Sequence, residues 1–189
     1  MISSLQILET WQDCATLAAK SAAFSALNVA FRNALTCTGS LTRHLESALG
    51  EPLRVRLEQQ SLRQEWQDDP ILWNGSHHLP TGEEILVRDA WLSIRQQDVI
   101  FAHSEMVLAG LAPELRTAVD QGAEPLGLLF QGQAGDVRRQ RLELARALVP
   151  ELARRTGLPV DQIFWCRRSL FMAGNVLRAR ILELFIKWE

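Results

Sequence analysis

The sequence predicts an α+β protein in which helices pack on a single antiparallel sheet. Three observations predict this class. Apolar residues recur at helical spacing within residues 1–49. Two pairs of long, mostly apolar segments are each separated by a short turn, as in β-hairpins. Short segments with helix start and stop signals connect the remaining elements.

The N-terminal part is expected to be helical throughout residues 1–49. Ala, Leu and Phe recur at helical spacing through Ser21–Leu35, and Ser40 is suited to cap a second short helix. Pro52–Glu58 alternates apolar and charged residues, which predicts a half-buried strand. Residues 66–84 hold Pro, Gly, Asn and His and are predicted to form a loop.

The rest of the chain supplies the hairpins and two short helices. The predicted hairpins pair Ile85–Ile94 with Val99–Leu108, and Ile163–Ala173 with Val176–Trp188 around Gly174-Asn175. The predicted helices are Pro113–Gln121 and residues 150–157, the second ending at Gly157. Val137–Leu148 fits either a strand or a helix.

Composition limits the function classes. The 189 residues are 47% hydrophobic and 22% charged, as in one soluble globular domain over residues 1–189. A net charge of −2 gives no global attraction to nucleic acid or anionic membrane. No apolar run approaches the ~18 residues of a membrane span. Glu9 and Asp13 interrupt the position of a signal peptide's apolar stretch, so we expect a cytoplasmic protein.

Metal and cofactor motifs are missing from the sequence. The three cysteines form no CxxC pair, and no zinc, nucleotide or calcium motif occurs, so no metal site is expected. His77 and His78 fall in the predicted loop and are expected to be solvated.

The first hairpin contains the most informative residue, Arg88. A connection of two or four residues around Arg95–Asp98 places Arg88 opposite Glu105 and Ala90 opposite His103. These side chains then share one mostly apolar face of the sheet. A loop of three or five residues would change the pairing.

A buried arginine needs a partner, because an unpaired charge is costly to remove from water. An internal ion pair with Glu105 would satisfy Arg88. A ligand carboxylate, which a guanidinium binds through two parallel hydrogen bonds, would satisfy it equally well. The hairpin alone does not choose between these two interpretations.

The last strand poses the same question for Glu183, which lies among large apolar residues in Ile181–Phe185. One interpretation is a salt bridge to Arg88, Arg178 or Arg180. The other is a carboxylate poised over a ligand. A buried Arg and a buried Glu on one sheet suit a small anion with a hydroxyl group at its far end.

Four segments together resemble the chorismate–pyruvate lyase family. They appear in the family's order and cover most of residues 35–186. The segments are GSLTRHLE at 39–46, Val87–Asp89 with Val99–His103, EPLGLLF at 124–130, and FWCRRSLF at 164–171 followed by Glu183-Leu-Phe.

The resemblance implies an antiparallel sheet with helical flaps over an enclosed ligand site. It also implies conversion of chorismate to 4-hydroxybenzoate and pyruvate, the first step of ubiquinone biosynthesis, without a cofactor or metal. The partners implied are this substrate and product, with no nucleic acid, and the family leads us to expect a monomer.

The family's site positions match five residues of this chain. Arg88 matches the arginine that holds the ring carboxylate. Glu183 matches the carboxylate that meets the ring hydroxyl, where it would orient that group or act as general base; we favour orientation. Leu41 and Leu126 match apolar residues that close the site. His103 stands where the family commonly has a second, substrate-binding arginine.

Three features depart from the family pattern. With His103, the second carboxylate of chorismate is expected to be held more weakly. Glu105 replaces an apolar residue and would compete for Arg88. The segment between Arg167 and Glu183 is about one residue longer, so the Gly174-Asn175 turn or a bulge must absorb one residue for Glu183 to face the site.

The sequence also bears on two other classes of function. The fold also occurs in effector-sensing domains of transcription regulators, so a non-catalytic module that binds a small aromatic acid is the alternative. Nucleic-acid binding through an arginine-rich region is disfavoured, because acids are interleaved and aromatic residues are missing. We expect those arginines to form a solvated surface. They are Arg138, Arg139, Arg141, Arg146, Arg154 and Arg155.

Overall fold

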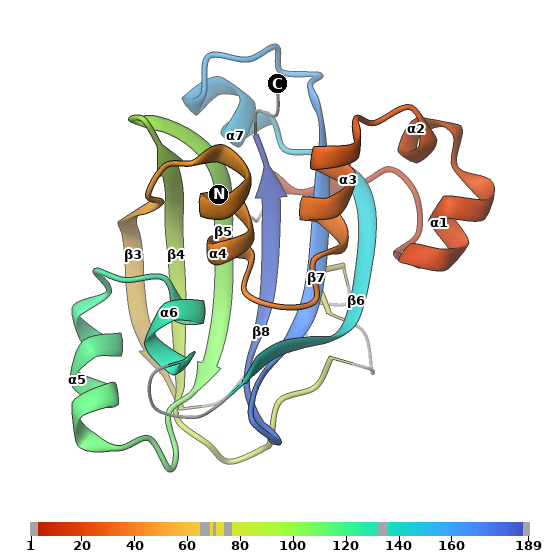
Figure 1. The fold of residues 1–189 in the computed structure, drawn as a ribbon. Coiled ribbons are helices and arrows are strands. Elements are labelled where there is room, and N and C mark those ends of the chain that lie inside the picture. Colours follow the sequence, from red (N-terminus) through yellow and green to blue (C-terminus); the bar gives the residue numbers. More distant parts are fainter. Residues whose placement is uncertain (1–3, 65–68, 70, 74–76, 132–135, 187–189) are drawn as a thin grey trace.

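The computed structural model describes residues 4–64, 69, 71–73, 77–131 and 136–186. It contains one antiparallel sheet of eight strands in the order β1-β6-β7-β8-β5-β4-β3, with β2 also pairing with β6 (Figure 1). The strands are β1 (Gln6–Ile7), β2 (Gln12–Asp13), β3 (Arg54–Arg63), β4 (Ile85–Ile94), β5 (Gln97–Val107), β6 (Val137–Leu148), β7 (Ile163–Ala173) and β8 (Val176–Phe185).

The helices confirm the α+β class. They are α1 (Cys14–Lys20), α2 (Ala22–Ser25), α3 (Val29–Thr36), α4 (Leu41–Leu49), α5 (Pro113–Gln121), α6 (Leu126–Gln131) and α7 (Pro150–Arg155). Ser40 caps α4 as expected, because its hydroxyl oxygen accepts a hydrogen bond from the Arg43 backbone nitrogen. The α6 helix was not expected from the sequence.

The helices divide between two faces of the sheet. We define the front face as the one that carries Arg88 and Ile181, and the back face as the one that carries Trp91 and His103. Helices α3, α4 and α6 cover the front face (Figure 1). Helix α7 and the segment that contains Trp73 pack on the back face.

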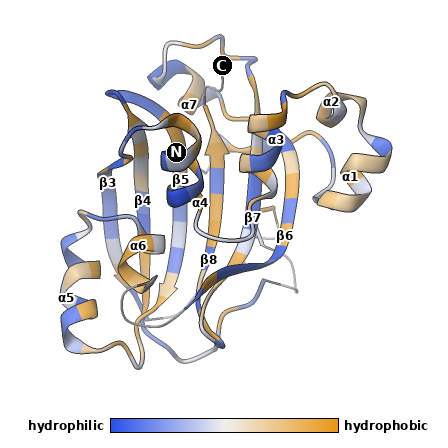
Figure 2. Cartoon of the chain, in the orientation of Figure 1, coloured by the Kyte–Doolittle hydropathy of each residue, from blue (hydrophilic) through white to orange (hydrophobic). Residues whose placement is uncertain are grey.

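The front face holds two apolar clusters at opposite ends of its strands. Under α1–α4, Phe31 and Leu45 pack with Phe185 of β8. Under α5 and α6, Leu115 and Phe130 pack with strand residues that include Ile181. Hydrophilic bands interrupt the hydrophobic strands β7 and β8 in the middle of the sheet (Figure 2). The central part of the front face is therefore where polar groups enter an apolar layer.

The N-terminal segment is not helical throughout, contrary to expectation. Short strands β1 and β2 pair with the outer edge of β6. This pairing satisfies main-chain groups that an edge strand leaves open, and such a long-range contact is not visible in local periodicity. Val137–Leu148 is a strand. Residues 187 and 188, at the end of the last predicted strand, lie outside the described residues.

The predicted register of the first hairpin is wrong by one residue. Arg95 and Gln96, both with positive φ, form a two-residue turn, so Ile94 pairs with Gln97. A bulge then shifts the pairing, and Leu92 lies opposite Ile100. Val99 is an extra residue in β5. Each β5 residue after it therefore points to the opposite face of the sheet from the one it would occupy without the bulge.

This shift separates Arg88 from His103 and Glu105. Arg88 lies opposite Ser104, and His103 lies opposite Asp89. His103 and Glu105 therefore belong to the back face. The expectation that Glu105 competes for Arg88 is wrong, because the two side chains point to opposite sides of the sheet.

A second bulge fixes the position of Glu183. The final hairpin begins with Ala173 opposite Val176, but Phe171 pairs with Ala179, so Arg178 is an extra residue in β8. Beyond the bulge Glu183 lies opposite Arg167. Of the two expected alternatives, the turn or a bulge, the structure contains a bulge, and without it Glu183 would face the back of the sheet.

The back face buries a paired polar network. The His103 Nδ1 lies 2.6 Å from Asp89 Oδ1, and its Nε2 lies 3.4 Å from Glu105 Oε1. Glu105 also accepts hydrogen bonds from Arg180 at 2.7 and 3.1 Å and from Trp73 at 3.1 Å. Each carboxylate of the network has a cationic partner, which is the condition for burying charge at tolerable cost.

The loop histidine His77 is buried rather than solvated. Its Nε2 lies 2.9 Å from the Arg141 carbonyl oxygen, and burial lowers its pKa despite that hydrogen bond. The Arg180 guanidinium donates to the His77 carbonyl at 3.4 Å. This part of the loop therefore covers the back-face network, which composition alone does not indicate.

The network predicts a specific pH dependence of stability. Burial by itself lowers the pKa of His103, but the hydrogen bonds and charges of Asp89 and Glu105 outweigh it and raise the pKa above its usual value. The stabilisation is therefore complete below the unfolded pKa of about 6.5 and is lost as pH rises through the higher folded value. We expect the urea-derived free energy of unfolding to fall as the pH rises above about 6.5.

The matched variant is His103→Gln, which removes the titrating group but keeps hydrogen-bonding atoms. Its unfolding free energy is expected to change less with pH over the same range. Equal slopes for the two proteins would contradict a raised pKa for His103.

Candidate active site

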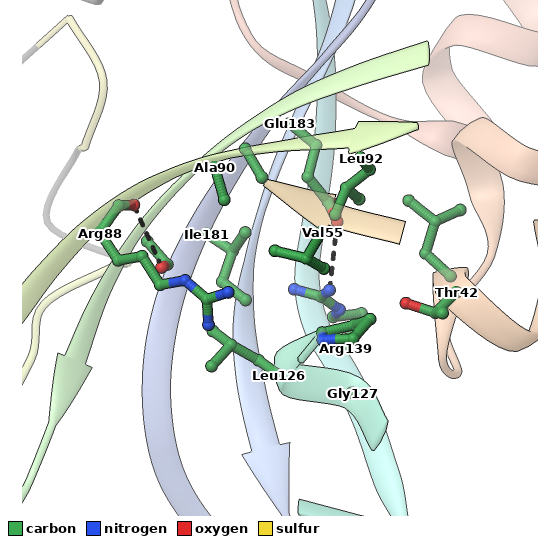
Figure 3. Close-up of a pocket in the computed structure, with 14 residues that line it drawn as sticks. Thr42, Val55, Arg88, Ala90, Leu92, Leu126, Gly127, Arg139, Ile181 and Glu183 are labelled. Atoms are coloured by element: carbon green, nitrogen blue, oxygen red, sulfur yellow. Dashed lines mark hydrogen bonds and ion pairs between the residues drawn. The ribbon is translucent and has the colours of Figure 1, made fainter. Parts of the chain in front are cut away.

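The front face contains a pocket between the two apolar clusters (Figure 3). Its floor is formed by small side chains of β4 and β5, namely Ala90, Ala102 and Ser104. The empty space between its lining atoms, with the opening to solvent included, is about 510 Å³. The other lining residues are Leu41, Thr42, Val55, Arg88, Leu92, Pro125, Leu126, Gly127, Arg139, Ile181 and Glu183.

Arg88 enters the pocket from β4 with only part of its guanidinium satisfied. Its Nη2 donates to the carbonyl oxygens of Gly122 and Glu124 at 2.7 and 3.1 Å. Its Nε and Nη1 are buried and have no hydrogen-bond partner among the described residues. Burial lowers the pKa of the group. No carboxylate in the described part of the chain pairs with Arg88, so the internal ion-pair interpretation is wrong.

Glu183 projects from β8 into the same pocket and lies between two guanidinium groups. Its Oε1 accepts from Arg139 Nη2 at 3.2 Å, and its Oε2 accepts from Arg167 Nε at 2.6 Å. Burial by itself raises the pKa of Glu183, but the two arginines outweigh it and hold the pKa below its usual range. The salt bridge predicted from the sequence, to Arg88, Arg178 or Arg180, is therefore not formed; Glu183 pairs with two other arginines.

Arg167 has a structural role in this arrangement. The side chain is fully buried, and its Nη1 donates to the carbonyl oxygens of Ala34, Leu35 and Cys37. These carbonyls lie at the C-terminal end of α3, where a helix favours positive charge. Arg167 therefore joins α3 to Glu183 and does not line the pocket, as expected for a structural arginine.

Arg139 is a pocket residue that the sequence interpretation missed. We expected it on a solvated surface, but its side chain is only 6% exposed. It lies opposite Phe171 on the front face, with Cζ 5.1 Å from the centroid of that ring. Alternation in a strand places Arg139 on the same side as Val137, which is buried. Alternation predicts a buried Arg139 only once Val137–Leu148 is known to be a strand, and the sequence left a helix open.

Two helices form the roof of the pocket. Leu41 and Leu126, the first residues of α4 and α6, both line it. The two helices approach each other closely at Gly127, where an added Cβ would lie 2.9 Å from Ser40 Oγ. An alanine at position 127 would therefore force the Ser40 hydroxyl to move.

The structure brings four of the five predicted site residues to one pocket. Arg88, Glu183, Leu41 and Leu126 all line it. His103 does not, because the Val99 bulge turns it to the back face. Its placement as a substrate-binding residue is therefore wrong.

Comparison with known proteins identifies the family. The model of the chorismate lyase family matches residues 10–187. The chain belongs to the chorismate lyase family. A probable chorismate pyruvate-lyase of Psychromonas ingrahamii is 30% identical over 141 residues, covering 72% of each chain. Another from Methylococcus capsulatus is 32% identical over 152 residues, covering 78% of this chain and 89% of that protein.

Solved structures share the fold at lower identity. The effector domain of PhnF from Mycobacterium smegmatis has a TM-score of 0.59 and 16% identity, covering 78% of this chain and 88% of that one. The ligand-binding domain of a putative GntR-family regulator from Bordetella bronchiseptica has a TM-score of 0.50 and 20% identity, covering 71% and 85%. The chain thus shares its fold with this effector domain and this ligand-binding domain.

Other site types find no support in the described residues. They contain no group of three or more His, Cys, Asp or Glu side chains arranged to hold a metal ion. None of their helices combines the length and the apolar character that a membrane crossing requires.

The contact between the flaps yields a test of the roof geometry. We expect Gly127→Ala to destabilise the protein by about 0.5–2 kcal/mol, because the methyl group displaces the Ser40 hydroxyl that caps α4. In a Ser40→Ala background the same substitution should cost less, since the overlapping atom is gone. The measurement is the free energy of unfolding of all four proteins.

Gly39→Ala is the matched control, because nothing lies within 4 Å of an added Cβ there. Additive effects of the Gly127 and Ser40 substitutions would contradict a direct contact between the flaps.

Proposed function

We propose that this protein converts chorismate to 4-hydroxybenzoate and pyruvate. The observation that carries the proposal is a buried, half-satisfied guanidinium of Arg88 that shares an apolar pocket with the Glu183 carboxylate. A ligand with an anionic group at one end and a hydroxyl at the other complements these two groups. Membership of the chorismate lyase family supports chorismate as that ligand.

The two polar groups suggest one orientation of the substrate. Its ring carboxylate accepts a charge-assisted hydrogen bond from Arg88, whose Nε and Nη1 lack partners among the described residues. The ring lies against the small and apolar side chains of the floor and walls. Its C4 hydroxyl meets Glu183 at the other end. The flaps α4 and α6 then exclude water from the ring.

The reaction needs little more than this positioning. The electron pair of the C4–H bond becomes the third double bond of the ring. The C3–O bond breaks, and its pair leaves with the enolpyruvyl oxygen as pyruvate enolate. The enolate gains at its methylene carbon the proton that C4 loses. Atoms and charge balance without an oxidant or reductant, and aromatisation makes the step downhill, which supports a cofactor-independent lyase.

Glu183 acts as an orienting group rather than as general base. Both of its oxygens already accept hydrogen bonds from arginines, and its lowered pKa makes it a weak base near neutral pH. It remains a good acceptor for the C4 hydroxyl proton, because a carboxylate has more lone pairs than its two arginine contacts occupy.

The wider assignment follows from the family resemblance. It supports the first step of ubiquinone biosynthesis, in the cytoplasm, as the place of this reaction. The alternative is a module that binds a small aromatic acid without turnover, which the likeness to the PhnF effector domain supports. Release of pyruvate from chorismate separates the two functions.

The decisive measurement is incubation of the purified protein with chorismate, with chromatography for 4-hydroxybenzoate and an enzymatic assay for pyruvate. We expect both products from the wild type. Arg88→Ala should lower kcat/KM by about a hundredfold or more and weaken 4-hydroxybenzoate binding, because it removes charge-assisted hydrogen bonds worth roughly 1.5–3 kcal/mol each.

The control is Arg56→Ala, which removes an arginine of the neighbouring strand that is 55% exposed and pairs with Asp98. It should leave turnover nearly unchanged. Tight 4-hydroxybenzoate binding without pyruvate release would favour the binding module, and an unchanged Arg88→Ala variant would refute the role of Arg88.

A further inference from the structure

The buried charges on the front face do not balance. Arg88, Arg139 and Arg167 bring three guanidinium groups to the pocket and its wall, and Glu183 is the carboxylate among them. If all four groups are ionised, they carry a net charge of two positive. The buried acids Asp89 and Glu105 cannot compensate, because they face the back of the sheet and pair with His103 and Arg180.

Arg139 is the second incompletely satisfied cation of the pocket. Its Nη2 shares Glu183 with Arg167, and its Nη1 reaches Ser169 Oγ at 3.4 Å. Its Nε is buried without a partner among the described residues. Burial lowers the pKa of Arg139, and the attraction of Glu183 does not restore it. Such a group gains free energy from an additional anion.

Arg139 and Arg88 address different parts of the pocket (Figure 3). Arg88 lies beside Ile181 and Leu126, and Arg139 lies at the other end of the pocket, bonded to Glu183. In the orientation proposed above, the ring carboxylate binds the Arg88 guanidinium, and the C4 hydroxyl donates a hydrogen bond to Glu183. Ring carbon C3, which carries the enolpyruvyl ether, is adjacent to C4. The C3 substituent is therefore brought next to Arg139.

We propose that Arg139 is a second anion-binding residue, which holds the enolpyruvyl carboxylate of chorismate and stabilises the departing pyruvate enolate. This inference rests on the proposed lyase function and deepens it. The two carboxylates of chorismate match the two uncompensated positive charges of the pocket. Arg139 thus takes the task that the sequence left open when His103 stood in place of a second arginine.

The role in the reaction is electrostatic. As the C3–O bond breaks, its electron pair moves to the ether oxygen, and the carboxylate held by Arg139 belongs to the same fragment. The guanidinium remains protonated throughout and stabilises the negative charge that develops on the enolate. The product 4-hydroxybenzoate lacks this fragment, so Arg139 favours chorismate over the product.

The test compares ligands with and without the second carboxylate. Arg139→Gln should lower kcat/KM for chorismate by about tenfold to a hundredfold, the loss expected for charge-assisted contacts. It should weaken 4-hydroxybenzoate binding much less than it lowers kcat/KM for chorismate, since 4-hydroxybenzoate contacts Arg139 only indirectly, through Glu183. Arg139→Lys keeps the positive charge and should retain most of the preference for chorismate.

Arg138→Gln is the matched control, because Arg138 is the exposed neighbour in the same strand and contacts Asn175. It should change neither quantity. Melting temperatures of all variants report folding, and Arg139→Lys supplies the comparison if Arg139→Gln does not fold.

A purely structural role for Arg139 predicts a different result. If it only positions Glu183, the affinities for chorismate and 4-hydroxybenzoate should fall together, and this outcome would overturn the proposal. A wild type that binds chorismate without releasing pyruvate refutes the lyase function, while the Kd comparison still decides the role of Arg139. A wild type that neither binds nor converts chorismate rejects both.

Discussion

An uncompensated positive charge inside an apolar layer is the constraint on which the pocket depends. The free energy cost of burying Arg88 is reduced by two backbone carbonyls, but two of its nitrogens have no partner in the described part of the chain. Arg139 adds a second incompletely satisfied group. In a medium of low dielectric constant these charges interact strongly with any anion that enters. The free energy cost of burying these charges is what the proposed anionic ligand would reduce.

The two faces of the sheet handle buried charge in opposite ways. On the back face His103 and Arg180 meet Asp89 and Glu105 within hydrogen-bonding distance, and the loop above covers the network. On the front face the cations exceed the available carboxylate. A closed network makes the back face rigid and leaves little reason for a ligand to bind there. The unbalanced charge is the reason for proposing the ligand site on the front face.

Small residues in the floor and a close contact between the flaps determine the shape of the pocket around these charges. Ala90, Ala102 and Ser104 leave room where larger side chains would complete the core. The apolar clusters on either side hold the strands, while α4 and α6 meet over the gap at Ser40 and Gly127. A ring-sized ligand can thus replace water beneath the roof, and the removal of water strengthens each electrostatic contact.

The sequence by itself determined the four strands of the two hairpins and the cap of α4, and it pointed to Arg88 and Glu183, because alternation and buried charge are local features. The tertiary structure decided which charges meet. One extra residue at Val99 turned His103 away, and long-range pairing of β6 brought Arg139 inward. Since side chains alternate with a period of two, a one-residue bulge reverses a face, and no local pattern reports where the bulge falls.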